Sequence, residues 1–274
     1  MFRPISFSGK LFRSYLLMKG HRSKIRIQNL AGKYFFGSGI SVLNDDKVHF
    51  KLQANDWITR TILKDGNYEP NSTQLAKRLL NNGGIFIDIG ANFGLFSCIV
   101  AKQNLGIKVL SIEPNYQMIE RLIQNIRLNF MENRVQIFNT AISKKLQWVT
   151  MEQPASDNLG TTATRAGQQG LLSILSCPLE FLFKENNIKV AELIKIDIEG
   201  NEFEILEDFP FNLYFVKNII LEYNHLSQIS FGKIRDFFIS QNFKCFTIFG
   251  EELINEEQSI PENNIWFENQ NTYK

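Results

Sequence analysis

Cysteine is scarce in this chain of 274 residues, which contains only three. Cys98, Cys177 and Cys245 are widely spaced, and no CxxC pair or histidine cluster accompanies them. Disulfide-stapled domains and cysteine-ligated zinc sites both need cysteines in even or motif-forming sets. We therefore expect neither a disulfide framework nor a zinc site, and a reducing, cytoplasmic location fits this cysteine usage best.

Long apolar runs are also missing, although 44% of the residues are hydrophobic. Charged residues interrupt every apolar stretch well before the roughly 20 residues that a membrane-spanning helix needs. The chain is nevertheless long enough to bury a large core. Its composition predicts a soluble protein with one elaborated domain, or one domain with a small appendage.

Acidic residues are absent from residues 1–44, which carry eight lysines or arginines. These bases are Arg3, Lys10, Arg13, Lys19, Arg22, Lys24, Arg26 and Lys33. Residues 45–274 hold 22 bases against 28 acids, a net charge of −6. A basic arm with apolar residues can contact a membrane surface or an acidic partner, or serve as an organelle presequence. The simplest alternative is a solvated or partly packed extension.

The first part of the chain predicts a small lead-in structure. Three short segments have the pattern of antiparallel strands: residues 24–30, 33–43 and 47–54. Residues 72–82 predict a helix with Ser72 as its N-cap. We therefore divide the chain into residues 1–70, a basic arm with an antiparallel lead-in, and residues 71–274, the main domain.

From residue 84 onward, strand-like and helix-like segments alternate. Seven short apolar runs predict strands: residues 85–89, 108–113, 134–141, 192–198, 216–223, 244–249 and 264–268. Helical periodicity lies between them, as where Met118, Leu122 and Ile126 recur at a spacing of four. This alternation predicts an α/β fold whose mostly parallel sheet is covered by helices on both faces. Residues 143–177 interrupt it and predict an insert of extended pieces at one end of the sheet.

The first of these strands ends in IDIGANFG, residues 87–94. The first strand-to-helix turn of an open α/β sheet is the usual ligand cradle, and Gly90 and Gly94 would let a ligand approach the backbone. Their G-x-x-x-G spacing fits neither the dinucleotide pattern G-x-G-x-x-G nor a P-loop. Glu113 ends the second strand, 23 residues beyond Gly90, where a carboxylate can accept both hydroxyls of a ribose. The pattern indicates a nucleoside cofactor without a phosphate requirement and disfavours a nicotinamide oxidoreductase.

Four ordered blocks resemble the FkbM family of class I S-adenosylmethionine-dependent methyltransferases: IDIGANFGLFS, SIEPNYQMIERLIQNIRLN, VQIFNTAIS and LIKIDIEGNEFEIL. The resemblance extends over residues 63–224. It implies a Rossmann-like, doubly wound sheet of seven strands whose last strand is antiparallel. It also implies S-adenosyl-L-methionine as cofactor and a hydroxyl of a sugar, a polyketide or a related small molecule as methyl acceptor.

The resemblance further implies which residues hold the cofactor. The expected set is Glu69, Asp88, Gly90, Ala91, Asn92, Gly94, Glu113, Pro114, Asn115, Asn139 and Ala141. Asp88 and the glycine turn are expected at the methionine and ribose end, and Glu113 at the ribose hydroxyls. The two residues after Glu113 and the edge from Asn139 to Ala141 are expected to contact adenine. The turn that contains Glu69 is expected to close over the methyl donor, or is simply a turn before Pro70.

Charged residues on the predicted strand 192–198 are the candidates for chemistry. Lys195, Asp197 and Glu199 alternate with isoleucines, so they share one face of the strand. Charge on a buried strand is costly unless it is paired or functional. Asp197 or Glu199 is therefore expected to act as a base or to position the acceptor, with Lys195 beside them. Glu222 and His225 follow the next strand and are expected to face the same crevice.

Three alternatives remain open for these residues. The charged strand end can be a structural ionic network, because perturbed ion pairs often are. Asp197, Glu199 and Glu222 can instead hold a divalent metal ion that acidifies a sugar diol. His225 can be an ordinary surface residue. We list no metal ligands among the expected site residues.

The leading functional hypothesis is an O-methyltransferase that acts on a sugar, a glycan or another small molecule. The alternative is a non-catalytic module that binds S-adenosylmethionine or a glycan. Nucleic acid is not an expected partner, because the acidic body offers no positive track for phosphates and no [DNS]-P-P-[YFW] block follows the fourth strand of the alternating region. The sequence does not define the oligomeric state.

Overall fold

The structure is a computed structural model in which residues 1–18, 39–54, 56–151, 164–166, 172–198, 202–223, 229–255 and 258–273 are described. Its centre is a seven-stranded sheet in the order β15-β16-β14-β12-β4-β5-β6. The strands are β4 (Gly84–Ile89), β5 (Ile107–Ile112), β6 (Val135–Phe138), β12 (Leu193–Ile196), β14 (Asn218–Glu222), β15 (Phe243–Thr247) and β16 (Asn264–Asn269). All neighbours pair in parallel except β16, which is antiparallel to both β14 and β15. The predicted sheet with an antiparallel last strand is confirmed.

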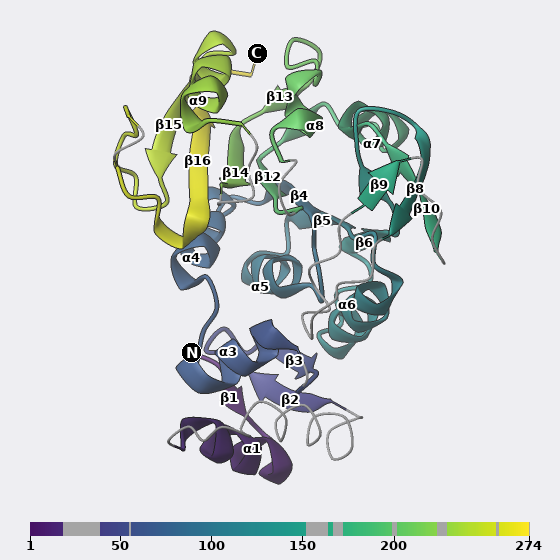
Figure 1. The fold of residues 1–274 in the computed structure, drawn as a ribbon, viewed down its shortest axis with the longest axis vertical. Coiled ribbons are helices and arrows are strands. Elements are labelled where there is room, and N and C mark those ends of the chain that lie inside the picture. The colour runs from purple at the N-terminus through teal and green to yellow at the C-terminus, as the bar shows by residue number, and fades with distance from the viewer. Residues whose placement is uncertain are drawn as a thin grey trace.

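Helices cover both faces of this sheet, which Figure 1 shows nearly edge-on. One face carries α4 (Pro70–Leu79), α5 (Leu95–Gln103) and α6 (Tyr116–Leu128), and the other carries α7 (Leu179–Glu185), α8 (Glu204–Glu207) and α9 (Phe231–Ser240). Successive residues of a strand point to opposite faces of the sheet. Phe86 packs in the core with α4, α5 and α6, and Ile87 packs in the core with α7, α8 and α9. The α/β fold predicted from the alternating sequence pattern is therefore confirmed.

Helix α6 illustrates how local sequence sets an element. The side chain of Asn115 accepts a hydrogen bond from the Gln117 N–H and so begins the helix. Met118, Leu122 and Ile126 are buried on one stripe, as their spacing predicts. Two further buried side chains on this helix and just after it, Asn125 and Asn129, bind the backbone of a neighbouring strand rather than the main sheet.

That neighbour belongs to an N-terminal antiparallel sheet in the order β1-β2-β3. Its strands are β1 (Arg3–Pro4), β2 (Ile40–Leu43) and β3 (His49–Leu52), and the helices beside it are α1 (Phe7–Leu17) and α3 (Trp57–Asp65). The amide groups of His49 and Lys51 donate to the side chains of Asn129 and Asn125 at 2.8 Å. An antiparallel lead-in is thus confirmed, but the strand expected at residues 24–30 lies outside the described residues.

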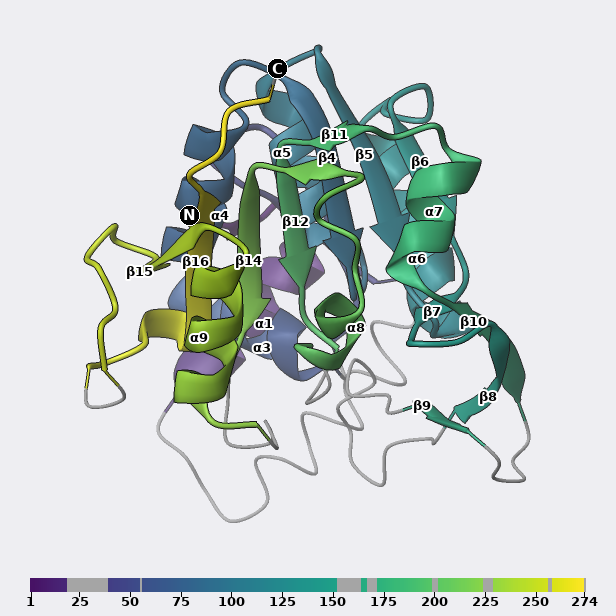
Figure 2. The same ribbon diagram turned by 90° about the horizontal axis from the view of Figure 1, so that it is seen from above.

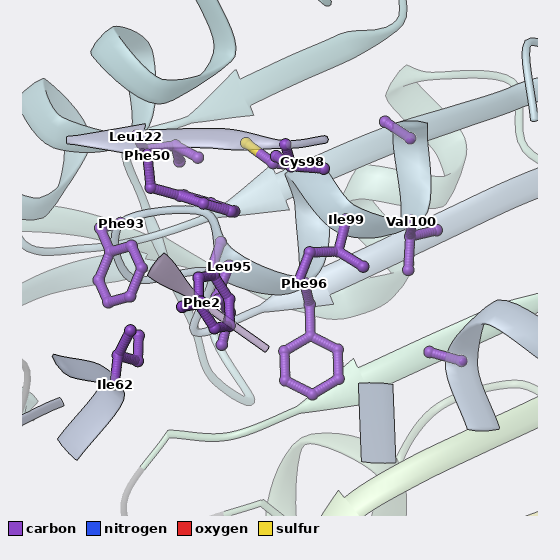
Figure 3. Close-up of a cluster of buried hydrophobic side chains, with 14 of the residues drawn as sticks. Phe2, Phe50, Ile62, Phe93, Leu95, Phe96, Cys98, Ile99, Val100 and Leu122 are labelled. Atoms are coloured by element: carbon purple, nitrogen blue, oxygen red, sulfur yellow. The ribbon is translucent and has the colours of Figure 1, made fainter. Parts of the chain in front are cut away.

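The described part of the basic arm is packed rather than solvated. Phe2, Phe12 and Leu16 are buried in the same core as the helices α4 to α6. Figure 3 shows Phe2 and Phe50 near Phe93, which lies in the turn between β4 and α5. The ring of Phe50 lies 5.7 Å from that of Phe2 and 6.3 Å from that of Phe93, measured between centroids. The division of the chain at residue 70 remains a proposal.

The insert predicted at residues 143–177 forms a second small sheet. Its strands are β7 (Ala141–Ile142), β8 (Gln147–Met151), β9 (Thr164–Ala166) and β10 (Ser173–Cys177), in the order β7-β10-β8-β9. Figure 2 shows this sheet beyond the ends at which β4, β5 and β12 point. A two-stranded pair, β11 (Val190–Ala191) and β13 (Phe215–Val216), lies at the opposite end. In the described residues, no helix combines the length and apolar character needed to cross a membrane.

Two glycines of the turn after β4 differ in what surrounds them. Gly90 and Gly94 both have positive φ, +81° and +88°, which disfavours any other residue. A Cβ at Gly90 would lie 1.8 Å from the backbone oxygen of Asp197, whereas one at Gly94 would lie 2.4 Å from a side-chain carbon of Leu122. Protein atoms therefore already require glycine at both positions, before any ligand is considered.

Replacing these glycines with alanine should give unequal losses of stability. Gly90→Ala should lower the free energy of unfolding by about 3 kcal/mol or more, because a backbone oxygen on a central strand cannot move aside. Gly94→Ala should cost about 1–2 kcal/mol, because the Leu122 side chain can change its rotamer. Urea unfolding of both variants measures the difference; equal losses would show that the approach of β4 to β12 does not constrain Gly90.

Candidate active site

The carboxyl ends of β4 and β5 are joined by one buried carboxylate, that of Glu113. It accepts hydrogen bonds from the N–H of Asn92 at 2.8 Å and from the N–H of Asn115 at 2.7 Å. Glu113 is only 6% exposed. Burial raises its pKa to about 7, although the two backbone hydrogen bonds oppose this shift. Glu113 therefore fixes the glycine turn to the end of β5 and changes its charge near neutral pH.

The turn itself is held by backbone groups. The N–H groups of Gly90 and Ala91 both donate to the carbonyl of Ile112, at 2.9 and 3.0 Å. Asn92 has φ of +52°, and its side chain accepts a hydrogen bond from the N–H of Phe93. Such left-handed residues outside glycine are uncommon and cluster at functional turns. The backbone of the predicted cradle is therefore rigidly attached to β5.

The segment that follows β6 contributes the next two residues of the predicted cofactor site, Asn139 and Ala141. The side chain of Asn139 donates to the carbonyl groups of Glu113 and Pro114, both at 2.9 Å. Asn139 is exposed, whereas Ala141 is buried in the small core of the insert. The predicted adenine-contacting positions are thus brought together at one edge, beyond the ends of β5 and β6.

Asp88 is engaged with the protein. Its Oδ2 accepts hydrogen bonds from the N–H of Ser97 at 3.1 Å and from the Ser97 hydroxyl at 2.6 Å. The carboxyl is 2% exposed, and burial raises its pKa, against the lowering effect of the Lys195 charge. Asp88 therefore anchors the first turn of α5, while it lies directly opposite Lys195 in the sheet register.

Lys195 is a buried cation at the centre of the site. Its side chain is 3% exposed, and its Nζ lies 2.7 Å from Oδ2 of Asp197 and 4.6 Å from the ring centroid of Phe96. Burial lowers the pKa of this ammonium group, but the charges of Asp197, Glu69 and Asp88 together act more strongly and raise it. Lys195 is therefore charged at every physiological pH. The ion pair expected for a structural ionic network is present.

Asp197 lies at the carboxyl end of β12 and keeps a side-chain exposure of 27%. Burial raises its pKa, but the Lys195 charge and hydrogen bonds from Lys195 and Glu222 outweigh burial and lower it. Asp197 is therefore an ionised carboxylate beside Lys195. Two further predicted catalytic residues, Glu199 and His225, lie outside the described residues.

The turn before α4 reaches the same acids. Glu69 has φ of +43°, an unusual conformation for a residue that precedes proline. Burial raises its pKa to about 7, although the Lys195 charge lowers it. Burial also raises the pKa of Tyr68, and the charges of Glu69 and Asp197 add to that shift. The structure thus places Tyr68 and Glu69 close to the charges of Lys195 and Asp197.

Sequence reasoning missed two residues that hold this turn in place, Glu262 and Asn264. The Glu262 carboxylate accepts four hydrogen bonds of 2.6–3.0 Å, from the backbone and side chains of Asn71 and Ser72. The Asn264 amide donates to Glu69 Oε2 at 3.3 Å and to the Ser72 hydroxyl at 3.1 Å. Residues nearly 200 positions apart therefore meet at the start of α4.

The prediction that Ser72 caps this helix is wrong. The helix begins at Pro70 with Glu69 as its N-cap residue, and neither Glu69 nor Ser72 supplies a side-chain cap. Glu262 satisfies the free N–H groups of Asn71 and Ser72 instead. Proline is common at the first helical position, so Pro70 was the better local signal.

A metal site receives no support from the part of the chain that is described. Within it, no group of three or more histidine, cysteine, aspartate or glutamate side chains is arranged to hold a metal ion. Lys195 occupies the position between the acids, where a cation would otherwise balance their charge. Glu199, one of the ligands considered for a metal, is outside the described residues.

Residues 88–245, more than half of the chain, match the family described as the Methyltransferase FkbM domain. The chain belongs to this FkbM methyltransferase family. Hexuronic acid methyltransferase AglP of Haloferax volcanii is 22% identical over 173 residues, which are 63% of this chain and 69% of AglP. The protein is thus an S-adenosylmethionine-dependent methyltransferase, and S-adenosylmethionine is its cofactor.

Solved methyltransferase structures are similar to parts of the chain. TrmK of M. capricolum, solved with S-adenosylhomocysteine, is 18% identical, with a TM-score of 0.45 over 75% of this chain and 70% of TrmK. An O-methyltransferase of Bacillus cereus is 13% identical, with a TM-score of 0.42 over 73% of this chain and 81% of that enzyme. Both scores are below 0.5, so the assignment rests on the family match and on the strand order.

The residues at the site fit the cofactor chemically. S-adenosylmethionine carries a sulfonium cation and a ribose diol, which call for negative charge and for a carboxylate acceptor. The site supplies Glu113 at the glycine turn and the acids Glu69 and Asp197 around one lysine. A carboxylate oxygen that accepts one N–H bond, as each oxygen of Glu113 does, keeps a lone pair for a hydroxyl.

Removing the Glu262 carboxylate should weaken the start of α4. Glu262→Ala should lower the free energy of unfolding by about 1–2 kcal/mol, the range for loss of a helix cap. Glu132→Ala, which removes an exposed carboxylate in the turn after α6, should leave stability within about 0.5 kcal/mol. Urea denaturation of the two variants provides the comparison, and similar effects would show that Glu262 does not cap the helix.

Proposed function

We propose that this FkbM methyltransferase transfers a methyl group to a hydroxyl of a sugar, a glycan or a related small molecule. The observation that carries the proposal is the ionised carboxylate of Asp197, partly exposed at the carboxyl edge of the sheet beside the glycine turn. AglP, a methyltransferase of a hexuronic acid, supports a sugar-type acceptor.

The proposed cofactor site uses the residues that the family resemblance named. Glu113 accepts hydrogen bonds from the ribose hydroxyls, and Asn139 and Ala141 border the adenine. The remaining proposed contacts are Glu69, Asp88, Gly90, Ala91, Asn92, Gly94, Pro114 and Asn115. Support comes from the hydrogen bonds that place the turn, the end of β5 and Asn139 in one connected unit.

Bound S-adenosylmethionine supplies an electrophilic methyl group, and the chain's own residues position the acceptor. Methyl transfer is an in-line displacement, so correct placement of the two reactants provides most of the acceleration, on the order of 7–11 kcal/mol. The Asp197 carboxylate accepts the hydrogen bond of the reacting hydroxyl and thereby orients its oxygen. Lys195 holds that carboxylate in place through a contact of 2.7 Å.

The hydroxyl proton is lost as the oxygen bonds to the methyl group, and a carboxylate within reach accepts it and passes it to solvent. Asp197 is a weak base because Lys195 lowers its pKa, so its main proposed role is to orient the hydroxyl. Glu222, Glu199 and His225 remain proposed participants in proton removal.

Cofactor affinity should depend on pH through Glu113. Its pKa of about 7 means that the carboxyl is protonated below neutral pH, and only the ionised form accepts two ribose hydroxyls. Binding of S-adenosylhomocysteine should therefore weaken about tenfold between pH 8 and pH 6. In Glu113→Gln, affinity should be at least about tenfold lower at pH 8 and should vary less with pH.

Calorimetry at both pH values measures these affinities. Glu69 also has a pKa of about 7, so its ionisation should affect cofactor affinity as well. The pH dependence of affinity that remains in Glu113→Gln should come from Glu69. A glutamine variant that retains both the affinity and the full pH dependence would remove Glu113 from the ribose site.

Methyl transfer itself is tested with a panel of acceptors that contains uronic acids, neutral sugars and phenols. Active acceptors should gain 14 Da by mass spectrometry, in step with release of S-adenosylhomocysteine, and uronic acids or neutral sugars should be preferred. Asp197→Asn should lower kcat by about 100- to 10,000-fold and leave cofactor affinity within about threefold.

Asp65→Asn makes the same chemical change on an exposed residue of α3 and should leave kcat unchanged. Cofactor binding without product on any acceptor would favour the alternative of a non-catalytic binding module. Full turnover in Asp197→Asn would exclude that residue from acceptor positioning.

A further inference from the structure

Helix α1 has two apolar faces, and in the described part of the chain only one of them is buried. Gly9, Phe12 and Leu16 are buried against the N-terminal elements. Phe7 and Leu11, on the other side, are 78% and 56% exposed. At about 100° per residue, their direction is roughly opposite to that of the buried stripe. The helix is therefore held in the fold by one face and presents the other to its surroundings.

The exposed apolar surface extends beyond these two positions. Further apolar side chains on or beside α1 are exposed by roughly half or more: Met1, Ile5, Leu17 and Met18. Figure 1 shows α1 at the end of the molecule that is farthest from the main sheet. Isolated exposed apolar residues are ordinary, but six of them on and beside one helix indicate an interaction site.

The charged residues of α1 itself are all basic, Lys10 and Arg13, and Lys10 is exposed. Arg3, just before the helix, has a side-chain exposure of 73% and lies 3.9 Å from the exposed carboxylate of Asp45, the one acid that pairs with it among the described residues. No acidic residue occurs in residues 1–44, whereas the rest of the chain has a net charge of −6. A partner that complements this surface must have an apolar interior and an anionic surface layer.

We propose that α1 docks this methyltransferase on the surface of an anionic phospholipid bilayer. Phe7, Leu11 and Met18 would enter the headgroup and acyl boundary, and Arg3 and Lys10 would contact lipid phosphates. A second copy of the chain fits less well, because pairing α1 with itself brings two basic helices together. An acidic protein would satisfy the charge but offers no reason for the exposed apolar side chains.

The acidic body gives the docking a defined orientation. Its net negative charge is repelled by the same lipids that attract the N-terminal surface. The docking helix is connected to the turn before α4 through α3. α1 packs on α3, and the ring of Trp57 at the start of α3 lies 6.1 Å from that of Tyr68, beside Glu69. The proposal does not depend on which acceptor the enzyme methylates.

Vesicle flotation with the full chain tests the proposal. The wild-type protein should float with phosphatidylcholine vesicles that contain 30% phosphatidylserine, and should bind at least about fivefold less to pure phosphatidylcholine. The double variant Phe7→Ser/Leu11→Ser should lose at least about fivefold in binding to the anionic vesicles. Arg3→Gln/Lys10→Gln should lose binding mainly at physiological salt, where screening weakens the charges that remain.

The matched control removes two equally exposed apolar side chains elsewhere. Leu213 and Phe249 are 61% and 57% exposed, so Leu213→Ser/Phe249→Ser should bind anionic vesicles as the wild type does. Thermal unfolding by circular dichroism establishes that all variants fold. Three results would overturn the proposal: equal binding to neutral vesicles, unchanged binding of the α1 variant, or dimerisation in light scattering that the α1 variant abolishes.

Discussion

The site depends on one buried ion pair network, centred on the ammonium group of Lys195. A cation that is almost inaccessible to water and lies 4.6 Å from the centre of the Phe96 ring needs negative partners close by. Asp88, Asp197 and Glu69 supply them, and they come from the strand β4, the end of β12 and the turn before α4. The attraction between Lys195 and these acids therefore sets the relative position of the three segments. The glycine turn lies against the same residues, because Gly90 contacts the backbone of Asp197.

Two carboxyl groups of this region, those of Glu69 and Glu113, change their charge near neutral pH. Lys195 stays positive, Asp197 stays negative, and Glu69 and Glu113 have pKa values of about 7. A cationic sulfonium cofactor therefore meets a crevice whose negative charge grows as the solution becomes more basic. Burial makes the carboxyl groups adjustable in this way, because the same groups at the surface would be fully ionised.

Much of the fold was predictable from local patterns. The spacing of Met118, Leu122 and Ile126 indicated α6, and the alternation of Lys195 and Asp197 with isoleucines correctly placed the charges on one face of β12. Glu262 and Asn264 were missed because their partners lie about 190 residues away. The local sequence PENN contains no pattern that predicts contact with a distant helix. The glycine motif was recognised, but its crowding against the Asp197 carbonyl is a tertiary contact that sequence alone does not reveal.

The strand that comes last in the sequence, β16, is not an edge strand of the sheet. β16 lies between β14 and β15, and the residues at its start, Glu262 and Asn264, clasp the first turn of α4. During synthesis, the cofactor cradle formed by β4 and β5 emerges from the ribosome long before this clasp exists. Glu69 acquires its final setting only when residues 262–269 have been translated and inserted. The turn before α4 is thus completed by residues that are translated about 190 positions after it.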